Sequence, residues 1–471
     1  MLSRAWPVIG LLAVTACGDT AANMPADSPT APAAPRGLAQ VGGCPAGAKC
    51  LPVDENGRAS ATGQFVAQCS GRYPDYVDRV PANHSGRRFV LSQSFPTSVP
   101  ETSKTGPWLK IDFKTDAGAV DYMMALRAYV YEGMIEADWR AEDNKVRRWY
   151  HVPWMTAGAR PREFLRGMTQ ERSIFGPELS IKKGRMVQNW AVGYYNDVGA
   201  LSIGAVWSPP LGPNPAGAQS AVGTVVSKIL FSAATADDFE GPDLLEGAPA
   251  MDVNLIATPK PPIQKRIAQV RLLQMDVSAR DPRAPETGWV FGTFAYDRNA
   301  KGANGWEKMV PVGLMWGTDP GVLPGSGQKI TESRINASAP AYALGHLGWG
   351  GRMNGPVDNP VSSCLGCHAA AQVPQVLESL IPYRECTDQQ RLQWFRNLKG
   401  DIAFGSVARK SCVPDAAQKP AVALDYSLQQ AVALNNVASG NFVNPCAGGQ
   451  RSAIVTGGKP TPSQKVFAIE R

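Results

Sequence analysis

The sequence predicts an α+β protein in which a β-rich sandwich, jelly-roll-like or Ig-like, precedes a small domain that is mainly helical or irregular. The chain has 471 residues, of which 44% are hydrophobic and 18% charged, enough for two or three domains with buried cores. Runs rich in β-branched and aromatic residues dominate residues 87–325. Residues 326–471 instead contain alanine-rich, helix-compatible segments separated by loops.

Residues 1–16 have the plan of a cleaved export signal, with Arg4, a short apolar run and small residues before Cys17. The apolar run is too short to span a bilayer as a helix. Because the residues up to Cys17 resemble a bacterial lipobox, the resemblance implies lipidation of this cysteine on the periplasmic side of a membrane. Gly18 slightly favours the outer membrane. The alternative is an ordinary secretory signal.

Two segments separate the signal from the β-rich region. Residues 17–43 are rich in Ala, Pro, Ser and Thr, a composition that predicts a flexible tether. Residues 44–86 form a mixed segment that contains three cysteines.

Eight runs in the β-rich region have the composition of strands, namely 108–113, 146–152, 189–195, 201–207, 224–231, 267–277, 289–296 and 309–316. In the sixth run the apolar residues change phase between Leu272 and Leu273, which predicts a β-bulge. Residues 196–199 are typical of a hairpin loop.

Helices are expected at four places. Met123, Val130 and Met134 recur at near-helical spacing, which predicts a helix over residues 121–138. The alternative there is a pair of strands broken near Gly133. In the C-terminal region the helix-compatible segments are 369–381, 387–398 and 425–438.

The C-terminal region contains the most specific motif of the chain, Cys364-Leu-Gly-Cys367-His368. Cys-x-x-Cys-His is the spacing at which two thiols attach one haem covalently and the adjacent imidazole ligates its iron. A zinc site would need a second close pair of ligands, and the next cysteines stand alone. The motif therefore predicts one c-type haem, with His368 as metal ligand, in a haem domain spanning 326–471.

Six cysteines remain once Cys17 is assigned to lipid and two to haem. They are Cys44, Cys50, Cys69, Cys386, Cys412 and Cys446. An exported protein favours disulfides, and six cysteines allow three bridges in 15 connectivities. Because three lie near each end of the chain, at least one bridge joins the two ends if all six pair. Unpaired buried thiols are the alternative.

The sixth iron ligand has no obvious candidate downstream, because no Met or His follows His368. Upstream candidates are His346, in a glycine-rich stretch, and Met353 as the alternative. His84 and His151 are more remote. An open or water-bound iron is the remaining possibility, and the three arrangements differ in redox potential and in access for small ligands.

Two further residues near the motif are cofactor-binding candidates. The Arg352 guanidinium has the geometry to pair with a haem propionate, and Trp349 has the size to stack beside the porphyrin. A solvated arginine and a tryptophan at an interface are the alternatives.

The haem-site segment resembles that of a largely uncharacterised family of bacterial exported cytochrome c-like lipoproteins with a single Cys-x-x-Cys-His site. The fragments that carry the resemblance are 349–360, 362–368, 162–164, 188–193, 288–294 and 424–428. The resemblance covers most of the mature chain and implies a β-rich portion ahead of the haem. It implies no established substrate.

These observations favour a periplasmic, lipid-anchored mono-haem cytochrome that transfers electrons to or from a redox partner protein. The alternatives are a peroxidase-like, haem-dependent enzyme with an open iron site, and an envelope glycan-binding sandwich with a sensory haem. The formal charge of +7 is not concentrated in a basic block with aromatics, which argues against nucleic-acid binding. Phosphate-loop, zinc-helix and nucleophile-elbow motifs do not occur.

Overall fold

The computed structural model describes residues 65–66, 80–81, 83–92, 94–100, 104–153, 155, 162–208, 213–258, 264–374, 379–383, 385–407, 412–415, 421–436 and 442–443. The predicted signal, Cys17, the tether, and Cys44, Cys50, Cys69 and Cys446 lie outside these residues.

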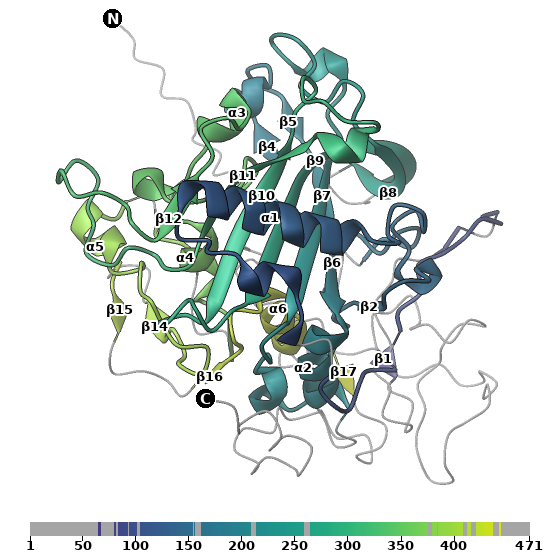
Figure 1. The fold of residues 1–471 in the computed structure, drawn as a ribbon. Coiled ribbons are helices and arrows are strands. Elements are labelled where there is room, and N and C mark those ends of the chain that lie inside the picture. Colours follow the sequence, from purple (N-terminus) through teal and green to yellow (C-terminus); the bar gives the residue numbers. More distant parts are fainter. Residues whose placement is uncertain are drawn as a thin grey trace, which may run out of the picture.

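A nine-stranded antiparallel sheet forms the centre of the molecule (Figure 1). Its main path runs in the order β12-β11-β10-β9-β7-β6-β2, with β3 paired to β6 and β8 to β9. The strands are β2 (Trp149–Tyr150), β3 (Thr169–Gln170), β6 (Asn189–Asn196), β7 (Val225–Ser232), β8 (Ala250–Thr258), β9 (Gln264–Arg280), β10 (Trp289–Tyr296), β11 (Met309–Met315) and β12 (Ser333–Ile335).

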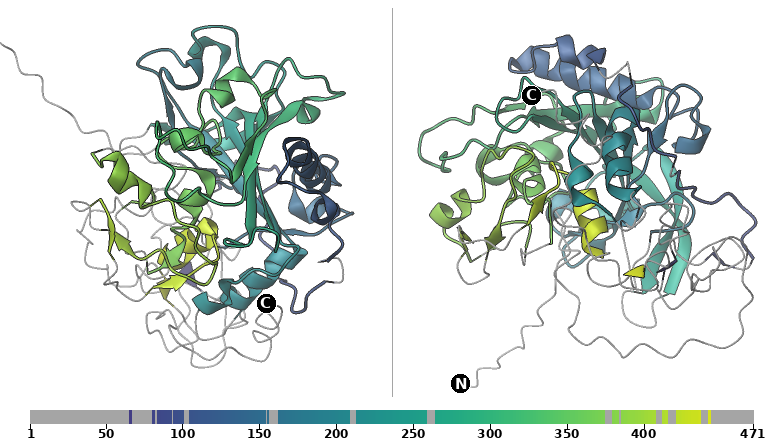
Figure 2. Two further views of the ribbon diagram at one scale, coloured as in Figure 1. Left: turned by 60° about the vertical axis from the view of Figure 1, so that its left-hand side comes forward. Right: turned by 90° about the horizontal axis from the view of Figure 1, so that it is seen from below.

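Both faces of this sheet are covered, and by different parts of the chain. Along β10, Val290 and Phe294 pack into a core under helix α1 (Asp116–Tyr131), whereas Trp289 and Phe291 pack into a second core with the C-terminal segment. Successive strand residues point to opposite faces, so every residue of β10 is buried. Figure 2 shows α1 on one side of the sheet and the C-terminal segment on the other.

Helix α1 confirms the predicted helix, although it begins and ends earlier than the expected 121–138. The Thr115 hydroxyl accepts a hydrogen bond from the Gly118 amide and so caps its first turn. Met123 lies against Gly292 of β10, where a Cβ atom would come within 2.2 Å of the methionine sulfur. The absence of a side chain at residue 292 therefore lets the helix approach the sheet.

The described residues correct the prediction of a sandwich, because the strands of the β-rich region join one large sheet and helix α1 covers a face expected to meet a second sheet. Alternating apolar residues show that a strand face is buried, but they do not show whether a helix or a second sheet covers it. The sequence therefore did not distinguish a helix-covered sheet from a sandwich. Strand β12, which follows residue 325, belongs to the sheet, and the second core contains residues from both sides of residue 325.

Two predicted strands are helical. Residues 201–207 belong to α2 (Asp197–Trp207), and the 3-10 helix η2 (Pro107–Lys110) replaces much of the run 108–113. The Asn196 side chain accepts a hydrogen bond from the Gly199 amide at 2.9 Å, so residues 196–199 begin a helix and are not a hairpin loop. Nearly every α2 residue is buried, and a helix buried all round lacks the amphipathic signal that distinguishes it from a strand.

The other strand predictions are confirmed within a few residues, as is the bulge. Leu230 of β7 pairs with Gln274 of β9, while the next residue, Phe231, pairs with Leu272. Leu273 is therefore the extra residue on β9, at the predicted phase change.

The C-terminal segment has shorter helices than expected. They are α3 (Ala341–Leu344), α4 (Cys364–His368), α5 (Asp388–Leu392) and α6 (Leu428–Asn436). The helix predicted over 369–381 is wrong at β13 (Gln372–Val373), which pairs with β16 (Val422–Ala423). In the described part of the chain, no helix has the length and apolarity required to cross a membrane.

The remaining elements are short. The two-stranded pairs are β1 (Phe65–Val66) with β17 (Phe442–Val443), β4 (Ile174–Phe175) with β5 (Met186–Val187), and β14 (Ser406–Val407) with β15 (Pro414–Asp415). The other 3-10 helices are Ala141–Asp143, Glu178–Ser180, Pro215–Ala218, Ala236–Asp238, Gly305–Lys308 and Trp349–Gly351.

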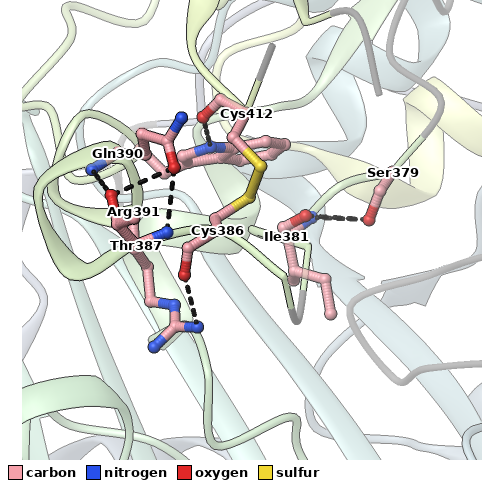
Figure 3. The surroundings of a disulfide bond; sticks show 8 residues. Ser379, Ile381, Cys386, Thr387, Gln390, Arg391 and Cys412 are labelled. Carbon is pink, nitrogen blue, oxygen red and sulfur yellow. Dashed lines mark hydrogen bonds between the residues drawn. A yellow bond between two sulfur atoms is a disulfide. The ribbon is translucent and has the colours of Figure 1, made fainter. Parts of the chain in front are cut away.

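One of the predicted disulfides is present, between Cys386 and Cys412 (Figure 3). The Cys386 carbonyl accepts a hydrogen bond from Arg391 and the Cys412 carbonyl accepts one from Trp394. The bridge thus ties α5 and the turn after it to the loop 26 residues further along the chain.

Candidate functional site

The Cys-x-x-Cys-His motif forms helix α4, Cys364–His368. The Ser363 hydroxyl accepts a hydrogen bond from the Gly366 amide at 3.1 Å and caps the helix at its start. Cys364, Cys367 and His368 stand at positions i, i+3 and i+4, which share one helix face. Both cysteines are buried thiols in the core between the sheet and the C-terminal segment.

The imidazole of His368 is held by a backbone carbonyl. Its Nδ1 lies 2.8 Å from the Tyr426 carbonyl oxygen, so Nδ1 carries the proton in this hydrogen bond and Nε2 keeps its lone pair. The ring also packs on Phe291 of β10, with ring centroids 4.7 Å apart. Burial lowers the pKa of His368 from 6.5 to about 4, which keeps the ring neutral, the form that ligates a metal.

His368 lines a cavity of about 120 Å³ between the sheet and the C-terminal segment, part of it open to solvent. Its lining is mostly apolar and includes Val226, Val277, Phe291, Leu380, Leu428 and Val432. Gly193 of β6 also lines it, and a Cβ atom there would lie 2.1 Å from the Gln429 side chain. The glycine therefore lets α6 approach the sheet at the cavity.

The sheet adds a charged group of residues to the same cavity, formed by Glu171, Lys228 and Asp276. Lys228 Nζ lies 3.2 Å from Asp276 Oδ2 and 3.9 Å from Glu171 Oε2. Thr293 donates a further hydrogen bond to Asp276. Burial raises the pKa of both carboxyl groups. We call these three residues the charged floor.

Sequence reasoning missed the charged floor, although a signal for it exists. Lys228 is the single charged residue of the predicted strand 224–231, and Asp276 is the single acidic residue of the predicted strand 267–277. The structure pairs the two directly across β7 and β9. A charged residue inside an otherwise apolar strand indicates that its side chain does not face an apolar core.

The two leading candidates for sixth iron ligand do not line this cavity. His346 Nε2 lies 2.9 Å from the Asp358 carbonyl oxygen, and the Met353 side chain is fully buried, with its sulfur near Gly313 of β11. Met155, which sequence reasoning did not single out, lines the cavity together with His368.

Arg352 and Trp349 lie in the second core, but their contacts are with protein groups. The Arg352 guanidinium is fully buried and donates to the carbonyls of Thr318, Trp349, Asp319 and Val322. Trp349 stacks on Phe395 with centroids 5.0 Å apart, and the Arg352 guanidinium lies 4.4 Å from the Phe395 centroid. The described conformation therefore places Arg352 in a structural role and leaves little of its donor capacity for a propionate.

The more remote histidines have structural contacts. His84 Nε2 lies 3.3 Å from the Arg87 carbonyl oxygen. His151 is 3% exposed, its Nδ1 lies 2.8 Å from the Gly193 carbonyl oxygen, and it packs against Phe89 and Tyr194.

The buried His151 is expected to make stability depend on pH. Burial, with a contribution from the charge of Arg162, lowers its pKa from 6.5 to about 3, so the unfolded chain binds a proton at a higher pH than the folded chain does. The contribution of His151 to the free energy of unfolding is then complete above pH 6.5. It decreases as the pH falls towards 3, by roughly 3 kcal/mol between pH 7 and pH 4.

Chemical denaturation of wild type and His151→Gln at the two pH values measures this contribution. The wild type is expected to lose more stability than the variant on acidification. An equal loss in both proteins would contradict the assignment.

Part of the arrangement that a covalently attached haem requires is present. The thiols and His368 share a helix face, the His368 ring lines a mostly apolar cavity, and its Nδ1 is anchored, whereas Cys364 and Cys367 lie in the packed core and do not line that cavity. Among the described residues there is no group of three or more His, Cys, Asp or Glu side chains placed to hold a bare metal ion. No protein-family model, curated protein or solved structure matches the chain.

Proposed function

We propose that the chain is an exported, lipid-anchored mono-haem c-type cytochrome, held on the periplasmic side of a bacterial membrane, that exchanges single electrons with a redox partner protein. The observation that carries the proposal is the geometry of His368. Its Nδ1–H is bound to the Tyr426 carbonyl while the ring lines an apolar cavity, the arrangement required of an axial histidine.

The chain's own residues have separate tasks in this proposal. Cys364 and Cys367 would hold the haem covalently, His368 would ligate its iron, and Phe291 fixes the histidine ring against the sheet. A bound haem supplies reversible one-electron chemistry.

A second function, peroxidase-like catalysis, is favoured by the charged floor. Buried charges are costly to retain in a cavity that serves only to enclose a cofactor. Carboxyl groups with raised pKa values, such as Glu171 and Asp276, hold a proton more readily than ordinary carboxyl groups do and are therefore suited to act as general acids and bases. In this function Glu171 would move a proton between the two oxygens of a peroxide.

Optical spectra of the purified holoprotein separate the two functions. A low-spin spectrum unchanged by carbon monoxide or cyanide, with no peroxide turnover, supports electron transfer. A high-spin spectrum that changes with either ligand supports catalysis. A colourless protein from a host that matures c-type cytochromes would contradict both.

If peroxide turnover is found, Glu171→Gln is expected to lower kcat by about 100-fold, the usual contribution of a general acid-base group. The substitution keeps the shape of the side chain and removes its proton affinity. Glu246→Gln, at a side chain that is 71% exposed, is the matched control and is expected to retain wild-type kcat. Equal rates in Glu171→Gln and wild type would exclude Glu171 from the reaction.

A further inference from the structure

The carbonyl that binds His368 belongs to an unusual backbone segment. Asp425 and Tyr426 are consecutive residues with φ angles of 46° and 65°. Aspartate adopts this left-handed region more readily than most residues, but a bulky aromatic residue rarely does. Such conformations persist only where surrounding contacts hold them, and they are frequent at functional sites.

The contacts that hold this segment converge on the Asp425 carboxylate. The residue is 1% exposed. Its Oδ1 accepts a hydrogen bond from the Trp289 indole nitrogen at 2.8 Å, and its Oδ2 accepts one from the Ser220 amide at 2.8 Å. Arg280 Nη1 lies 3.8 Å from Oδ1 and contributes a charge of opposite sign.

The surrounding backbone is shaped to receive this carboxylate. At Gly400 a Cβ atom would lie 1.9 Å from Asp425 Oδ1, so any other residue there would displace it. The Asp425 amide also donates to the Gly400 carbonyl at 3.2 Å. Both the side chain and the main chain of Asp425 are therefore fixed.

Strand β10 connects the Asp425 contact to the histidine. Trp289 and Phe291 are two residues apart, so they point to the same face of the sheet. Trp289 binds the Asp425 carboxylate and Phe291 packs on the His368 ring. One strand thus fixes both the imidazole and the segment that supplies its hydrogen-bond acceptor.

We propose that Asp425 is a positioning residue for His368: its carboxylate, held by Trp289, Ser220 and Arg280, keeps the Tyr426 carbonyl aimed at Nδ1 and so sets the tautomer and the donor strength of the histidine. The tautomer part concerns the polypeptide alone, and the part concerning donor strength rests on the proposed haem function.

The proposal has a defined redox consequence. A firm Nδ1–H hydrogen bond increases the electron density that the imidazole gives to a metal, which stabilises the oxidised iron. Loss of the Asp425 contacts lets residues 425 and 426 relax towards negative φ, and the Tyr426 carbonyl then turns away from Nδ1. The midpoint potential of the haem should therefore rise.

The test uses the full chain in two forms, with haem attached and without it. In the haem-free chain, nitrogen-15 NMR of the His368 imidazole is expected to show the Nδ1–H tautomer in wild type and a mixture of tautomers in Asp425→Ala. In the holoprotein, spectroelectrochemistry is expected to show an upward shift of the midpoint potential. Asp425→Asn keeps one oxygen acceptor and should give smaller changes in the same directions; it carries the test if the alanine variant does not fold.

Gln219→Ala is the matched control, because the side-chain amide of Gln219 donates to the Gly400 carbonyl beside the carboxylate site. This variant should keep the wild-type tautomer and potential. Unchanged tautomer and potential in the Asp425 variants, or equal changes in the control, would overturn the proposal. If wild type acquires no haem, the proposed function fails and the tautomer measurement alone decides the role of Asp425.

Discussion

Replacing Cys364 and Cys367 together with alanine is expected to abolish covalent haem attachment. The two thiols stand three positions apart on α4, beside His368, and no other Cys-x-x-Cys-His sequence occurs in the chain. The effect should be all-or-none, because each thioether bond requires one of these sulfur atoms. Intact mass and colour after acid-acetone extraction measure it, with the proteins produced in a host that matures c-type cytochromes.

The control for this experiment is Cys386→Ala with Cys412→Ala, which removes two cysteines of the same C-terminal segment that form a disulfide. That variant should lose stability but keep its covalent haem. A wild-type protein that shows no added mass on the peptide containing Cys364 and Cys367, or that gives up all its colour to acid acetone, would contradict the haem proposal.

Replacing Arg352 with methionine is expected to lower the free energy of unfolding by roughly 3–5 kcal/mol, with or without haem. The Arg352 guanidinium donates to four backbone carbonyls and lies against the rings of Trp349 and Phe395. Methionine has an apolar side chain that cannot donate a hydrogen bond, so the substitution leaves those carbonyls without this donor inside the second core. Chemical denaturation of the haem-free protein measures the loss.

Arg185→Met is the matched control, since the Arg185 side chain is 58% exposed and its nearest carboxylate oxygen lies 3.9 Å away. A change within about 0.5 kcal/mol is expected there. If Arg352→Met instead retained wild-type stability and lost haem or changed its potential, Arg352 would act on the cofactor, as the sequence first indicated, and not on the fold.

Short sequence patterns predicted the features of the fold that depend on residues close together in the chain. The phase change at Leu273 marked the bulge on β9, and near-helical spacing marked α1. The Leu201–Trp207 run was misassigned because α2 is buried on all sides, so its sequence carries no polar face to reveal the helical period. The Asn196 cap was the overlooked signal.

Some residues of the candidate site could be identified from the sequence, and others only from the structure. Cys364, Cys367 and His368 follow from their spacing alone, since attachment chemistry requires adjacent positions on one short helix. His346 and Met353 were selected by closeness in sequence, yet they do not line the cavity that contains His368, whereas Met155, more than 200 residues earlier, does. Distance along the chain does not measure distance in the fold.

The sequence by itself determined the Cys-x-x-Cys-His motif, the expected disulfide chemistry and most of the strand-forming segments, because each depends on residues that are neighbours in the chain. Only the tertiary structure placed Glu171, Lys228 and Asp276 in one cavity with His368 and held the Tyr426 carbonyl against its ring. Those contacts depend on strand register and on packing between segments up to hundreds of residues apart, which no local pattern encodes.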